Sequence, residues 1–470
     1  MANVLCLLLY IRCENNIART SEGLLRGYNV QTRNGRTVLG FSGIPYAKPP
    51  LGKLRFQDPQ PPDNWKGIKD AKHHRKLCVQ HAYIEEALKD LVMGSEDCLY
   101  LSVYTAKLKP KVLYPVMTYI HGGGFEIGIQ ELIFGPSYFM DHNVVLVLFN
   151  YRLGSLGLFH AAISESGNAL SNWAYAQPGF ARQLAVKSAE SLGCSTDDSQ
   201  KILDCLINKH PHAIARQQHN FTGRYVDVVP VFIPSSDLAT KEPLFPKDPK
   251  DLNTVQVPWM TGCNNLDGLL KSRLFVIHPD LYKKLQDNFV DLVPGLMKLS
   301  TRNTTVLNKL RKVYFGKSRI SKKLLRNITD MLTDYFFIWP MTKSLRTHSG
   351  PLYLYYNSYN GKQSLQNILL PYKALNGSFH GDEAMYLWHW PIALDPLYGQ
   401  DLKFSRLLVQ LWVNFATYGT PTPPGYKFNW PQWNQISQQY FKFNANGSVS
   451  VESHLASDRI KFWDNLGVAV

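Results

Sequence analysis

The chain has 470 residues, of which 45% are apolar and 12% aromatic, enough to bury a large core. It contains no internal repeat and no low-complexity tract, which excludes repeat architectures and favours one large domain. The formal net charge is +15, and no segment beyond the N-terminus is apolar over a length that would cross a membrane.

The N-terminus carries a short apolar run at residues 4–11. The run is far too short to span a membrane but fits the apolar region of a secretory signal. It lacks a leading basic residue and a clear cleavage site, so residues 1–20 are either a weak secretory signal or a truncated start. We expect the folded domain to occupy residues 21–470.

Strand-like runs alternate with helical stretches along the chain. PVMTYI (115–120) ends at a glycine cluster, and VVLVLF (144–149) is apolar on both faces, as in a central strand of a parallel sheet. Further strand-like runs are LFHAAI (158–163), VPWMTG (257–262) and LYLYY (352–356), and residues 265–348 are mostly helical in pattern. This alternation predicts an α/β fold with a mixed sheet, whose chemistry lies in loops at the carboxyl ends of strands.

Residues 309–326 hold eight Lys and Arg and no acid. Such a run could bind a polyanion. The alternative is a solvated helix face, because Leu, Val, Tyr and Phe recur at helical spacing. We favour the helix and expect no nucleic-acid partner, since no nucleic-acid motif accompanies the charge.

The seven cysteines show no metal-ligand spacing, so no metal site is expected. Sequons for N-glycosylation occur at Asn220, Asn303, Asn327, Asn376 and Asn446. A chain of this length contains several sequons by chance, so they are only weak support for a secretory route.

The stretch HGGGF at residues 121–125 directly follows the first strand-like run. Successive glycines leave backbone N–H groups unshielded, and such amides can stabilise the oxyanion of an acyl intermediate. An ordinary glycine-rich turn is the alternative.

Two later loops carry an acid and then a histidine: Asp267 in GCNNLDG and His380 in GSFHGDE. Taken singly, the first could be an Asx turn and the second a structural or merely exposed histidine. Their order matches the acid and base of the α/β-hydrolase series.

The chain resembles the type-B carboxylesterases, the family that includes cholinesterases, over residues 30–466. The resemblance rests on SEDCLYLSVYT, HGGGF, NYRLG, LFHAAISESGNAL, GCNNLDG, FHGDE and LWVNFATYGTPTP, which occur in family order, and on the stretch 34–65. It implies an α/β-hydrolase fold, with a mixed, mostly parallel sheet flanked by helices. It also implies a small carboxylic ester as substrate, and neither cofactor nor metal.

The resemblance assigns roles residue by residue. Gly123 and Gly124 would be oxyanion donors, Asp267 the acid and His380 the base. Disulfides Cys78–Cys98 and Cys194–Cys205 are implied, which favours a secreted or secretory-pathway protein, and Cys263 would be a buried free thiol.

Two departures from the family concern the acid and the substrate. The acid is usually glutamate, one methylene longer than Asp267. The loop between Cys78 and Cys98 holds no tryptophan, so choline esters are not expected.

The largest departure from the family is the absence of the segment that carries the nucleophilic serine. No G-x-S-x-G elbow exists anywhere in the chain, and Ser155, Ser164 and Ser166 do not occupy the required frame. Between Gly157 and Leu158 the family places about 60 more residues, roughly two βα units. We therefore expect a fold lacking about one to two central βα units, and no acyl transfer.

Three hypotheses follow from this gap. The chain derives from an esterase that lost an internal block through exon skipping or an error in the gene model, or it is a non-catalytic binding or adhesion relative, or it is a truncated product without function. We favour the first, because the joint falls between two undamaged motifs. A lost buried strand removes ~9–18 kcal/mol, comparable with the net stability of a whole domain, ~5–15 kcal/mol, so poor folding is expected.

Overall fold

The computed structural model describes residues 16–73, 77–81, 91–128, 134–151, 162–176, 179–217, 233–235, 247–252, 256–299, 301–390 and 396–468. The strands are β1 (Ile17–Arg19), β2 (Leu24–Arg26), β3 (Tyr28–Gln31), β4 (Thr37–Pro45), β5 (Ile68–Asp70), β6 (Gln80–His81), β7 (Val92–Met93), β8 (Tyr100–Thr105), β9 (Val116–Tyr119), β10 (Val145–Phe149), β11 (Ala162–Glu165), β12 (Trp259–Asn264), β13 (Leu352–Asn357), β14 (Gln439–Phe443) and β15 (Val449–Ser453). The α-helices are α3 (Phe180–Ser191), α4 (Ser199–Ile207), α5 (Pro211–Arg216), α7 (Leu269–Ser272), α8 (Leu274–Ile277), α9 (Asp280–Asp287), α10 (Phe289–Met297), α11 (Thr304–Phe315), α12 (Leu325–Thr333), α13 (Trp339–Thr347), α14 (Gln366–Leu369), α15 (Asp382–Leu387), α16 (Gly399–Tyr418) and α17 (Ser457–Asp464). Short 3₁₀ or π turns are η1 (Gly52–Leu54), η3 (Phe139–Asp141), η4 (Pro249–Asp251), η5 (Lys322–Leu324) and η6 (Asp334–Ile338).

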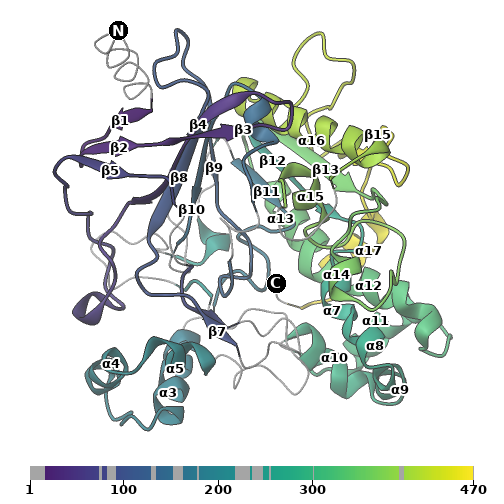
Figure 1. Ribbon diagram of the computed structural model, residues 1–470. Coiled ribbons are helices and arrows are strands. Elements are labelled where there is room, and N and C mark those ends of the chain that lie inside the picture. The colour runs from purple at the N-terminus through teal and green to yellow at the C-terminus, as the bar shows by residue number, and fades with distance from the viewer. Residues whose placement is uncertain are drawn as a thin grey trace, which may run out of the picture.

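Most strands belong to two five-stranded sheets. Their orders are β3-β4-β8-β10-β9 and β11-β12-β13-β14-β15 (Figure 1). In the first sheet β10 pairs parallel with β9 and antiparallel with β8. In the second, β11 to β14 run parallel and β15 antiparallel. The mixed α/β architecture expected from the sequence is therefore confirmed.

The expected strands are found at or near their predicted positions. β9, β10 and β13 match closely, and β12 begins at Trp259, two residues later than predicted. Of the run 158–163, the structure describes the last two residues, which open β11; the others lie outside the described residues. The Gly157–Leu158 joint also lies outside them.

The two sheets end at β9 and β11. In the described part of the chain, neither strand pairs along its second edge. Val116, the first residue of β9, is 50% exposed, and Ile120 just after the strand is 39% exposed. Long apolar edges are normally covered, because an uncovered edge invites pairing with other chains.

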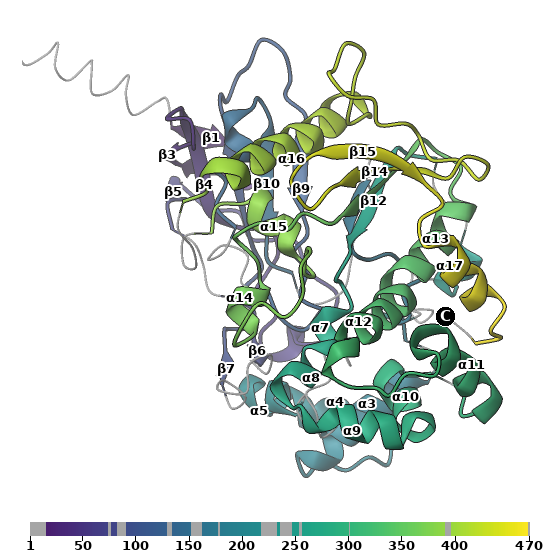
Figure 2. The ribbon, with the colours of Figure 1, turned by 90° about the vertical axis from the view of Figure 1, so that its right-hand side faces the viewer.

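Helices cover both faces of the second sheet, as Figure 2 shows. The alternation along β13 sorts its side chains between two cores. Tyr353 and Tyr355 pack in one core with α15 and α16. Leu352 and Leu354 pack in the other, with helices α7 to α13 and α17. The loops at the carboxyl ends of β12 and β13 are thus held between two large cores.

Both expected disulfides are present. Cys78–Cys98 closes the loop before β8, and Cys194–Cys205 ties the end of α3 to α4. Cys263 is free and fully buried in β12, as the resemblance implied.

The basic run folds as an amphipathic helix and its continuation. Asn303 caps α11 by accepting hydrogen bonds from the N–H groups of Thr305 and Val306. Leu307 and Leu310 are buried, while Lys309 and Lys312 are exposed. The prediction of a solvated helix face is confirmed; the absence of a nucleic-acid partner stays a prediction.

Four of the five sequon asparagines lie in the described residues, and Asn220 does not. Asn303, Asn376 and Asn446 are exposed, whereas Asn327 is half-buried and donates its side-chain N–H to the Tyr314 carbonyl. Within the described residues no helix is long and apolar enough to cross a membrane. Nor does that part of the chain hold a group of three potential metal ligands.

Candidate active site

The predicted acid and base are neighbours, although 113 residues separate them. Asp267 lies in the turn between β12 and α7, and His380 lies in the loop between α14 and α15. A bridge joins the two loops: the Leu266 N–H donates to the Ser378 carbonyl at 3.0 Å. His380 Nδ1 is then 2.8 Å from Asp267 Oδ1. The aspartate reaches the imidazole despite its shorter side chain.

The two side chains differ in exposure as an orienting acid and a working base should. The Asp267 side chain is fully buried, and its Oδ2 accepts the Asn264 N–H at 2.9 Å. The His380 side chain is 31% exposed, with its ring 5.1 Å from that of Phe337. With Nδ1 donating to the carboxylate, Nε2 is left to accept a proton. Among the described residues nothing is hydrogen-bonded to that nitrogen.

The glycine loop leaves β9 in a conformation that needs glycine. Gly123 has φ +125° and Gly124 has φ +61°. The Gly123 carbonyl accepts the N–H groups of Glu126 and Ile127, both at 3.1 Å, which closes the turn. In the described structure neither Gly123 nor Gly124 has an acceptor for its own N–H. The loop therefore presents two spare amide donors, as an oxyanion site requires.

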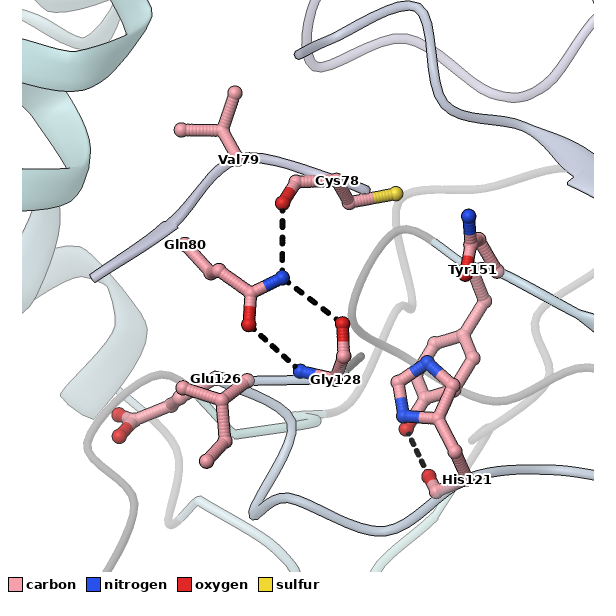
Figure 3. Close-up of a pocket in the computed structure, with 9 residues that line it drawn as sticks. Cys78, Val79, Gln80, His121, Glu126, Gly128 and Tyr151 are labelled. Atoms are coloured by element: carbon pink, nitrogen blue, oxygen red, sulfur yellow. Dashed lines mark hydrogen bonds between the residues drawn. The ribbon is translucent and has the colours of Figure 1, made fainter. Parts of the chain in front are cut away.

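Two side chains not singled out from the sequence, Gln80 and Tyr151, hold this loop, as Figure 3 shows. The Gln80 amide donates to the Gly128 carbonyl at 2.9 Å and accepts the Gly128 N–H at 3.0 Å. Tyr151 stacks on His121 at 4.3 Å and donates its hydroxyl to the His121 carbonyl. Burial lowers the pKa of His121. These residues enclose a cavity of about 10 Å³, the size of one water molecule.

Gly123→Ala is expected to lower the free energy of unfolding by at least ~3 kcal/mol. A methyl group at this position would lie 1.8 Å from the Ile127 carbonyl oxygen, in a backbone conformation unfavourable for alanine. Gly122→Ala is the matched control, because a methyl group there meets nothing within 4 Å. Urea unfolding measures the free energy of unfolding of both variants. Equal losses of stability in the two variants would contradict the tight fit around Gly123.

Two further carboxylates, also not predicted, lie near the acid and base. Glu165, at the end of β11, accepts the Trp412 indole N–H at 2.8 Å. Glu383, three residues after His380, accepts a hydrogen bond from the Asn264 amide. Burial raises the pKa of Glu165 to about 7. Burial, and then the charges of Glu165 and Asp267, raise the pKa of Glu383 well above its ordinary value.

Glu165→Gln is expected to raise the free energy of unfolding at about pH 8 by roughly 2–3 kcal/mol. Burial raises the pKa of Glu165 from 4.5 to about 7, so the folded state holds this proton more tightly than the unfolded state. Its stabilising contribution is complete below about pH 4.5 and is lost as the pH rises to about 7. Glutamine stays neutral and keeps an acceptor for Trp412.

Urea unfolding across this pH range measures the difference between the variant and the parent chain. Glu190→Gln, at an exposed position on α3, is the control and should leave the pH profile unchanged. Parallel profiles for Glu165→Gln and the parent chain would contradict the burial of this carboxylate.

The candidate serines do not complete the pair. Ser164 bonds to Thr261 at 2.8 Å and to the Trp259 indole at 2.9 Å. The Ser166 hydroxyl is buried and without a hydrogen-bond partner in the described part of the chain. Neither is hydrogen-bonded to His380, and Ser155 lies outside the described residues. Trp173 packs at the edge of the helical core, and its indole N–H donates to the Phe336 carbonyl.

Comparison with known proteins agrees with this geometry. The model of the carboxylesterase family matches residues 14–159 and 155–463. A juvenile hormone esterase of Tribolium castaneum is 29% identical, over 94% of this chain and 92% of the relative. A carboxylic ester hydrolase of Bombus ignitus is 28% identical, over 95% and 93% respectively. Carboxylesterase 1F of Mus musculus is 24% identical, over 95% and 93%. The chain therefore belongs to the carboxylesterase family, whose members are α/β-hydrolases.

Proposed function

We propose that this chain is the framework of a carboxylic ester hydrolase whose nucleophile is missing, and that it is inactive in acyl transfer as it stands. The observation that carries the proposal is the Asp267–His380 pair, joined at 2.8 Å with no hydroxyl bonded to Nε2 in the described residues. A base without a serine to deprotonate cannot form an acyl-enzyme.

Three observations support an absent central block rather than a single substitution. The two sheets end at β9 and β11, each without a partner on its outer edge in the described chain. The family model matches in two segments that overlap at residues 155–159. The alignments with relatives run over 526 and 553 positions, more than the 470 residues of this chain. All three agree with a loss of about one to two βα units between Gly157 and Leu158.

With a serine restored, the residues of this chain have defined tasks. His380 takes the serine proton at Nε2, while Asp267 holds the imidazole and stabilises the imidazolium. Gly123 and Gly124 donate their N–H groups to the oxyanion of each tetrahedral intermediate. Water then releases the acid, and no step needs a cofactor or a metal. The substrate class is a small carboxylic ester.

The retained chemistry favours an esterase origin over a binding or adhesion module. A pure binding protein does not require a buried acid, an oriented histidine and spare loop amides together. The two disulfides and the exposed sequon asparagines support a secreted glycoprotein. We therefore propose that the chain enters the secretory pathway, where its two disulfides form.

A serine-directed phosphonate applied to the expressed chain tests the proposal. No labelling above that of heat-denatured chain is expected, and stoichiometric labelling would contradict the missing nucleophile. Sequencing the transcript across codons 157 and 158 tests the origin of the gap. Recovery of longer transcripts with an in-frame elbow is expected if an internal block has been lost.

A further inference from the structure

A second cavity, of about 480 Å³, lies away from the acid and base. It opens where the end of β3, the loop before η3, the end of α15 and the start of α16 meet. Its lining includes Thr32, Arg33, Tyr138, Trp388, Leu402 and Arg406. The volume falls within the range of small-molecule sites, ~300–1,000 Å³. Neither Asp267 nor His380 lines it.

Two arginines, Arg33 and Arg406, line the cavity. The Arg33 side chain is 12% exposed, and its Nε lies 3.4 Å from the Asp141 carboxylate. Its guanidinium also donates to the Ser405 hydroxyl and lies 4.2 Å over the Tyr138 ring. Arg406 is exposed, and among the described residues its one hydrogen bond is to the neutral Asn34 amide. No carboxylate is among the described residues that line the cavity.

Much of the remaining wall is apolar and aromatic. Trp388 is 3% exposed and packs against Tyr119 and Phe139, with ring centroids 4.6 and 4.7 Å apart.

We propose that this cavity binds a small organic anion with an apolar or aromatic body. Arg406 at the mouth and Arg33 in the wall hold a carboxylate or sulfonate, as guanidinium groups do. The body of the ligand packs against Trp388, Tyr138 and Leu402. The site is one of binding only, and it does not depend on the proposed function.

Isothermal titration calorimetry of the full chain with naphthalene-2-sulfonate tests the proposal. Neutral 2-naphthalenemethanol has the same ring system without the charge. The sulfonate is expected to bind at least about tenfold more tightly than the alcohol, because charges in a partly desolvated site interact by more than 1 kcal/mol. Arg406→Gln should weaken sulfonate binding by about five- to tenfold and leave the alcohol unaffected.

Two variants locate the binding. Arg319→Gln, an exposed arginine far along the chain after α11, should leave both affinities unchanged. His380→Asn should also leave them unchanged, since that residue does not line the cavity. Equal affinity for both probes, no measurable binding of the sulfonate, or no effect of Arg406→Gln would each overturn the proposal. Loss of binding in His380→Asn would place the anion at the acid–base pair and overturn it as well.

Discussion

Insertion of an elbow block between Gly157 and Leu158 is expected to give an active esterase that a serine-directed phosphonate labels stoichiometrically. The block is taken from the aligned residues of the Tribolium castaneum relative, which covers 94% of this chain. The gain is expected because the other parts are in place: Asp267 already holds His380 at 2.8 Å, and the loop amides are spare. Hydrolysis of p-nitrophenyl butyrate should rise by about 10⁴-fold or more over the parent chain.

Matched variants of the chain with the inserted block test the roles of the new serine, His380 and Asp267 separately. Serine to alanine at the new elbow, and His380→Ala, should each return the rate to about the level of the parent chain, since a triad acts as a unit. Asp267→Asn should lower the rate by about 10⁴-fold, because an amide favours the wrong tautomer of the histidine. Full activity with His380→Ala would show that the base is assigned wrongly. Labelling of the parent chain would show that a nucleophile is already present.

Much of this candidate site could be predicted, because short sequence patterns indicate the strands and the loops that follow them. Apolar runs ending in glycine or an Asx turn located β9 and β12, and hence the glycine loop and Asp267. β12 starts later than predicted because Pro258 has no N–H to donate to a strand ladder. Disulfide partners followed from the resemblance, and the structure contains both.

Other features depend on tertiary contacts that no local pattern encodes. Gln80 reaches the glycine loop across 48 residues of sequence. The burial of Glu165 and Glu383 depends on β11 and α15 approaching each other, and neither carboxylate differs locally from a solvated one. The cavity beside Arg33 arises from three regions far apart in the chain, at residues 31–33, 137–138 and 385–406. The positive charge of this cavity could not be predicted from the sequence, because it depends on which arginines line the cavity and which carboxylates pair with them.

The same insertion is expected to stabilise the fold even when it cannot catalyse. A new strand between β9 and β11 would bury about six apolar side chains on both faces, a gain of ~9–18 kcal/mol before the cost of ordering the added residues. Val116, now 50% exposed, should become protected. Urea unfolding should show a clear rise in midpoint for the inserted chain with the elbow serine changed to alanine.

Hydrogen exchange tests where this stability arises. Amides of β9 and β11 should gain protection, whereas those of β13, already paired on both sides, should change little. Two prolines placed within the inserted strand are the control, since proline removes ladder hydrogen bonds and should abolish the gain. An unchanged midpoint, with β9 and β11 exchanging as before, would mean that the two sheets do not share a missing strand. The open edges of β9 and β11 would then need a different explanation.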